Sequence, residues 1–145
     1  KSPEYLRVCR TGFALTLPHE MFFYSAIHTG TAAKARQVIT EFRAGGGVEA
    51  YPYWEAGGIA RADSRLLTTV YRRGNRLLFV VGNMGDGGAF PIRLDLKRLK
   101  LGPVAEAVDR ETGAKLATGP DTVTVEIRKR DFALVEAVCA QTGGR

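Results

Sequence analysis

The sequence predicts a mainly β protein: an antiparallel β-sandwich of about seven strands, preceded by a short N-terminal helical and irregular segment. From Leu66 onward, short apolar segments recur between turn residues. A single helical stretch lies before them and ends at three consecutive glycines. With 145 residues, of which 45% are hydrophobic and 25% charged, the chain has the composition of one globular core.

The N-terminal part is predicted to be partly helical. Residues 32–43 form the expected helix, with a threonine cap before it and Gly45, Gly46 and Gly47 after it. Residues 13–27 are aromatic and apolar but contain Pro18, so they are expected to be irregular or partly helical. Near residue 64 the sequence pattern changes from helical and irregular segments to recurring strand-like segments. We therefore expect residues 1–64 to be the end of a neighbouring domain, cut at its start, and residues 65–145 to be the sandwich; coverage of one sheet by the N-terminal segment is the alternative.

The strands are predicted in chain order. Residues 66–71 and 76–81 form a hairpin around the turn at 72–75. Residues 92–96 alternate apolar and charged side chains, as a strand with one buried face does. Two more hairpins are expected, from 104–109 into 114–116 and from 123–127 through the turn at 130–131 into 132–138. The glycine-rich residues 82–88 lack the Gly-Lys-Ser/Thr ending of a phosphate loop, so they are interpreted as a connection between strands.

Composition and charge argue against several partners. The apolar runs are too short to span a membrane. The net charge of +6 would suit a polyanion, but basic and acidic residues are interleaved, and the basic clusters at 72–76, 97–100 and 128–130 fall at predicted turns or strand ends, so no nucleic acid is expected. Two histidines and two cysteines without metal-ligand spacing predict no metal or cofactor. Cys9 and Cys139 either form a disulfide or are both reduced and buried.

The aromatic run at residues 51–54 carries the candidate site. Tyr51, Tyr53 and Trp54 are the predicted ligand-binding residues, because Tyr and Trp rings form flat platforms for sugar rings. Packing in the core or at a domain boundary is the alternative. Glu49 and Glu55 flank the run, but glycoside hydrolysis needs two carboxyl groups about 5 to 10 Å apart in a cleft, and no spacing here indicates such a pair. No catalytic residue is predicted.

The order of these segments resembles the end of certain glycosidases. Tyr53-Trp54, residues 79–83 (Phe-Val-Val-Gly-Asn) and residues 130–132 (Arg-Asp-Phe) are similar to motifs in the C-terminal region of glycoside-hydrolase-like proteins of the family 123 type. The resemblance covers roughly residues 48–138. It implies a β-sandwich that follows a catalytic barrel, whose acids lie upstream and match no position of this sequence.

The sequence therefore predicts a non-catalytic accessory domain, structural or sugar-contacting, of a glycoside-hydrolase-like protein. A free-standing carbohydrate-binding module is one alternative, and it requires an exposed aromatic residue among those at 51–54. A small protein that dimerises through Met21, Phe22 and Phe23 is another. The sequence leaves open whether the protein is secreted or cytoplasmic.

Overall fold

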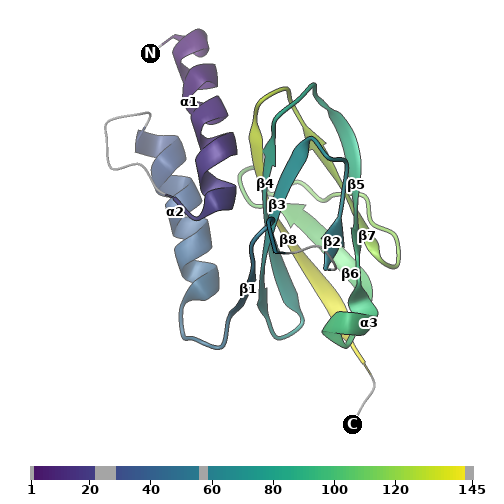
Figure 1. The fold of residues 1–145 in the computed structure, drawn as a ribbon. Helices are drawn as coiled ribbons and strands as arrows, with labels where there is room; N and C mark the ends of the chain where they lie inside the picture. Colours follow the sequence, from purple (N-terminus) through teal and green to yellow (C-terminus); the bar gives the residue numbers. More distant parts are fainter. Residues whose placement is uncertain (1, 22–28, 56–58, 143–145) are drawn as a thin grey trace.

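The computed structural model describes residues 2–21, 29–55 and 59–142, and these form three layers (Figure 1). Two antiparallel sheets form a sandwich, and two helices cover the outer face of the larger sheet. The elements are α1 (Pro3–Thr16), the 3-10 helix η1 (Leu17–His19), α2 (Thr29–Arg43), β1 (Glu49–Tyr51), β2 (Ala60–Arg61), β3 (Leu66–Arg73), β4 (Arg76–Asn83), β5 (Gly88–Leu94), α3 (Leu96–Leu99), β6 (Leu101–Asp109), β7 (Thr122–Ile127) and β8 (Phe132–Gln141).

The strand order confirms the predicted sandwich, with eight strands among the described residues. The larger sheet has the order β1-β3-β4-β8-β6, and the smaller sheet has the order β2-β5-β7. The short strands β1 and β2 lie within residues 1–64, and each adds an edge strand to one of the sheets. The expected hairpin of β3 and β4 is confirmed, with Leu66 opposite Asn83, Arg73 opposite Arg76, and Gly74 at the positive φ of 62° that this turn requires.

The hairpin predicted at residues 130–131 is wrong. Strand β7 pairs with β5 in the smaller sheet, whereas β8 lies between β4 and β6 in the larger one. The chain crosses from one sheet to the other at residues 128–131. Alternation reports which face of a strand is buried, but it does not report the pairing partner. The hairpin expected after β6 is present but short: Val108 pairs with Lys115 in an antiparallel bridge, and the Asp109 and Leu116 backbone amides donate to the Ala114 and Ala107 carbonyls at 2.8 and 2.9 Å.

Helix α1 was not predicted as a helix, yet its first residues carry the signals of one. Ser2 is the N-cap and accepts a hydrogen bond from the Tyr5 amide at 3.1 Å. Pro3 is the first helical residue, and Glu4 lies in the first turn near the positive end of the helix dipole. Pro18 does not disrupt this helix, because it lies in the 3-10 turn that follows it. Helix α2 confirms the predicted helix at 32–43 and begins three residues earlier.

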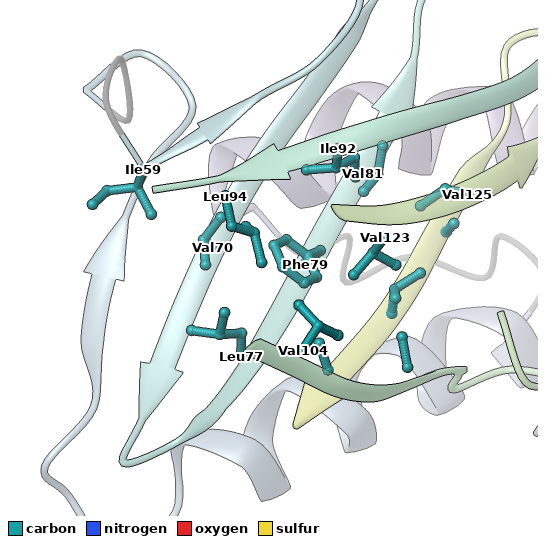
Figure 2. Close-up of a cluster of buried hydrophobic side chains, with 14 of the residues drawn as sticks. Ile59, Val70, Leu77, Phe79, Val81, Ile92, Leu94, Val104, Val123 and Val125 are labelled. Carbon is teal, nitrogen blue, oxygen red and sulfur yellow. The ribbon is translucent and has the colours of Figure 1, made fainter. Parts of the chain in front are cut away.

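The central strands of the larger sheet, β3, β4 and β8, are buried on both faces. Between the sheets lies an apolar cluster that includes the residues labelled in Figure 2. A second cluster lies between the larger sheet and the helices, with Phe13 and Leu17 from the N-terminal helical part and Val38 and Phe42 from α2. Strand β4 contributes to both clusters: alternate residues from Leu77 to Val81 face the smaller sheet, and those between them face the helices.

The helical layer approaches β4 closely at Gly82. A Cβ atom built on Gly82 would lie 1.8 Å from the Ala14 carbonyl oxygen and 3.1 Å from Pro18 Cγ. Only glycine leaves room for the end of α1 at this point.

The two cysteines are free thiols. Cys9 belongs to the cluster under the helices, whereas Cys139 belongs to the cluster between the sheets, and both are buried. Of the two alternatives, the structure therefore shows the reduced pair. Burial raises the pKa of the Cys139 thiol.

Candidate functional site

The aromatic run lies in a turn that is anchored to the core. After β1 the chain turns at Pro52, and the turn is closed by a hydrogen bond of 2.8 Å from the Glu55 amide to the Pro52 carbonyl. The Tyr53 amide donates to Thr69 Oγ1 at 3.1 Å, and this hydroxyl donates to the Pro18 carbonyl at 2.6 Å. Thr69 is fully buried. The turn is thus fixed to both β3 and the 3-10 helix η1.

Three rings meet at this turn. Tyr53 and Trp54 pack edge to face with ring centroids 5.3 Å apart, and the His19 ring stacks on Trp54 at 5.9 Å with an interplanar angle of 17°. His19 Nδ1 lies 2.6 Å from the Leu15 carbonyl, which can only accept, so Nδ1 carries the proton. In the neutral ring, Nε2 then accepts from the Tyr53 hydroxyl at 2.8 Å. We call His19, Tyr53 and Trp54 the aromatic cluster.

The aromatic cluster is partly open to solvent. Trp54 is 53% exposed even though the His19 ring stacks on it. The positions of Tyr53 and His19 are fixed by their hydrogen bonds, so Trp54 rests on a preorganised support. The cluster can therefore offer indole surface to a flat apolar ligand face without a change of backbone.

The structure does not bring Tyr51 to the same place. Tyr51 packs against the cluster between the sheets, and its hydroxyl donates to Glu49 Oε2 at 2.9 Å. Burial, and then the hydrogen bond and charge of Glu49, raise the pKa of Tyr51. The turn at Pro52 breaks the extended conformation that would have placed Tyr51 and Tyr53 on one face. Sequence reasoning missed His19, because it lies 34 positions from Tyr53 and carries no spacing signal.

The two candidate carboxylates are both exposed to solvent. Glu49 is exposed, binds the Tyr51 hydroxyl and lies 3.9 Å from Arg72 Nε. Glu55 is also exposed. A general acid of a glycosidase needs an environment that keeps its carboxyl group protonated, and solvent-exposed positions do not provide one. Among the described residues, no three His, Cys, Asp or Glu side chains gather as metal ligands.

Some apolar side chains of the N-terminal helical part are exposed. Val8 and Leu15, two turns apart on α1, are 65% and 52% exposed, and Met21 after η1 is 57% exposed. Phe22 and Phe23, which the dimer hypothesis includes, lie outside the described residues. No helix in the described ranges is both long and apolar enough to cross a membrane.

No protein family model matches the sequence, and no curated protein does. The crystal structure of a maltogenic α-amylase from Thermotoga neapolitana matches with a TM-score of 0.53 and 11% identity, over 94% of this chain and 37% of that chain. A GH27 β-L-arabinopyranosidase from Geobacillus stearothermophilus matches 57% of this chain and 20% of that chain, with a TM-score of 0.41 and 15% identity.

These comparisons describe architecture. The match to the amylase includes nearly the whole of this chain, so a glycoside hydrolase contains a similar arrangement. This chain spans little more than a third of the amylase that it matches. At such low identity the similarity is one of fold, and this chain shares its arrangement with part of that amylase.

Proposed function

We propose that this chain is a non-catalytic accessory domain of a larger glycoside-hydrolase-like protein, of the kind that follows the barrel in family 123-type proteins. The observation that carries the proposal is the match of 94% of this chain to 37% of a glycoside hydrolase. The dispersed, exposed carboxylates of the candidate site are consistent with a domain that leaves catalysis to another part of the protein.

The exposed apolar residues of the helical layer support a structural role. Val8 and Leu15 on α1 and Met21 after η1 leave apolar surface exposed, which a larger body of the same protein would cover. We propose that this surface faces the catalytic domain. A second copy of the chain could cover the same residues, which is the dimer alternative.

The aromatic cluster supports a sugar-contacting role. A ring that is supported on one side and open to solvent is the usual platform for a pyranose. Trp54 meets this description. The same observation favours the second candidate function, a free-standing carbohydrate-binding module.

The first experiment combines a hydrolysis assay with a binding titration. The purified chain should not cleave p-nitrophenyl glycosides. Cleavage activity that copurifies with the folded protein would exclude the accessory role. Trp54 is the only tryptophan, so its fluorescence reports directly on the aromatic cluster during titration with maltoheptaose. Saturable quenching would support sugar contact by this domain.

A matched pair of variants localises the contact. In calorimetric titrations, Trp54→Ala should abolish sugar binding. Tyr51→Phe should leave it unchanged, because Tyr51 packs against the apolar cluster between the two sheets. Equal effects of the two changes would contradict the proposed platform. Size-exclusion chromatography with light scattering distinguishes the two ways of covering α1: a dimer that Leu15→Glu converts to a monomer would assign the apolar surface to a second copy.

A further inference from the structure

A basic groove lies between α1 and the crossing segment at residues 128–131, away from the aromatic cluster. Its volume is about 310 Å³, at the lower end of the range for small-molecule sites. One wall is the side of α1 that carries Pro3, Leu6, Arg7 and Arg10, and the other wall is the crossing segment. The sequence predicts only solvated charge at 128–130, because it gives no sign that α1 lies opposite.

The groove carries an excess of positive charge. Five basic residues line it, Arg7, Arg10, Arg128, Lys129 and Arg130, against one acid, Asp131. Two further acids lie next to these bases: Glu111 pairs with Arg10 at 2.8 Å, and Asp86 lies 3.8 Å from Lys129. Counting all of them leaves five positive and three negative charges, a net charge of +2. The first turn of α1 adds the positive end of its dipole.

Two of the five bases, Arg10 and Arg128, pair with Asp131, and Arg10 is the more buried of the two. Arg10 Nε donates to Asp131 Oδ1 at 2.7 Å, its terminal nitrogens bind both oxygens of Glu111, and its guanidinium lies 4.4 Å from the centre of the Phe132 ring. Burial lowers the pKa of Arg10, but the hydrogen bond to Glu111 and the charges of Asp131 and Glu111 outweigh it and raise the pKa overall. Arg10 is therefore a fixed cation that joins α1 to the crossing segment.

The crossing segment is also held from behind. The buried Asn83 side chain donates to the Arg128 carbonyl at 3.0 Å, and the Asn83 backbone N–H donates to the Asp131 carbonyl at 2.8 Å. The Thr11 hydroxyl donates to the Arg130 carbonyl at 2.9 Å. With these carbonyls bound to the protein, the backbone is fixed while the side chains of Arg128, Lys129 and Arg130 remain exposed. Arg130 keeps a φ of 50°, a left-handed conformation that these bonds stabilise.

We propose that this groove binds a small organic anion, a sugar-sized ring that bears a carboxylate or phosphate. Arg7, Lys129 and Arg130 would bind the anionic group, since guanidinium and ammonium groups form charge-assisted hydrogen bonds to such oxygens. Pro3 and Leu6 would contact the apolar face of the ring. The bases gather around one compact groove and do not form a stripe along a surface, which favours a small anion over a nucleic-acid strand.

This inference extends the proposed function and does not depend on it, because the groove is formed by this chain alone. The groove proposal and the proposed function can also be refuted independently of each other. The accessory role is tested by hydrolysis and by the Trp54 titration, whereas the groove is tested with anions and with variants at residues outside the aromatic cluster.

The experiment is an NMR titration of the 15N-labelled chain at constant ionic strength with four probes: glucuronate, glucose 6-phosphate, glucose and inorganic phosphate. We expect at least one of the two organic anions to bind saturably, with amide shifts centred on residues 6–10 and 128–131. Glucose and inorganic phosphate should bind at least tenfold more weakly. A response to only one of the two organic anions shows whether the groove prefers a carboxylate or a phosphate. Equal binding of inorganic phosphate would show an adventitious ion only, and no saturable shift with either organic anion would equally overturn the proposal.

Matched double variants separate the groove from general charge. Arg7→Gln/Lys129→Gln removes two exposed cations of the groove, and Arg61→Gln/Arg98→Gln removes two exposed cations outside its lining. We expect the first pair to weaken binding at least tenfold and the second less than twofold. Equal losses would overturn the proposal, because binding would then follow net charge alone. Thermal melts of both variants confirm that each remains folded.

Discussion

Replacing Gly82 with alanine tests whether the helical layer belongs to the folding unit of the sandwich. The new Cβ would lie 1.8 Å from the Ala14 carbonyl oxygen, whereas Cβ atoms essentially never approach other atoms closer than 3.0 Å, so the two backbones must separate by at least 1.2 Å (3.0 minus 1.8). The Cβ position is fixed by the main chain and the atom it meets is a backbone oxygen, so no side-chain rotation relieves the contact. Overpacking costs typically 1 to 3 kcal/mol, and a backbone contact belongs at the upper end, at about 3 kcal/mol.

The assay is thermal unfolding followed by circular dichroism. In a protein of this size, about 3 kcal/mol corresponds to a fall in Tm of roughly 6 to 12 °C in a single cooperative transition. Gly88→Ala is the matched control, because its Cβ would meet only the far end of the Phe90 ring, at 3.2 Å, and its Tm should change little. An unchanged Tm for Gly82→Ala would refute the reasoning, since it would mean that α1 does not stabilise β4.

Two further predictions concern charged and titratable groups at the larger sheet. Glu136 is only 7% exposed and accepts hydrogen bonds from Arg76 and Arg110. Because both arginines remain partly exposed, Glu136→Gln should lower the free energy of unfolding, measured by urea titration, by about 2 kcal/mol. A loss below about 0.5 kcal/mol would contradict this. The pKa of Tyr71 is raised by its burial and then by its hydrogen bond to Glu20, so its stabilising contribution is present below the ordinary pKa of 10 and is lost as the pH rises above it. The stability difference between the wild type and Tyr71→Phe should therefore shift against the wild type by about 1.4 kcal/mol for each pH unit above 10, and a pH-independent difference between pH 8 and 11 would disprove the linkage.

The sequence predicted those elements whose signals are local. The β3–β4 hairpin has two apolar runs on either side of a short glycine-containing turn, and α2 ends at glycines of positive φ. Helix α1 was not predicted although Ser2 and Pro3 mark its start, because Pro18 within the apolar residues 13–27 indicated an irregular segment there. Pairing of β7 with β5 was not predictable, since it depends on contacts across the whole fold.

The candidate site was likewise predictable only where its residues are neighbours in the sequence. Tyr53 and Trp54 are neighbours in sequence and remain together, whereas His19 joins them only through the packing of η1 on β3. Tyr51 was separated from them by a turn whose closing bond involves only Pro52 and Glu55. The basic groove requires α1 and the crossing segment to meet, and no property of either segment alone indicates that meeting.

The burial of β4 on both faces has a consequence for how this sequence can vary. In a sheet with one solvated face, every second position accepts a polar residue with little loss. In β4 every residue from Leu77 to Gly82 is buried, with Leu78 and Val80 as constrained as Phe79. Accepted substitutions in this strand should therefore be limited to apolar residues of similar volume, and a change on one face should be compatible with packing in the layer that this face contacts. Homologous chains are thus expected to differ mostly in their loops and in the edge strands β1 and β2, while the six residues at the centre of the three layers stay nearly uniform in size.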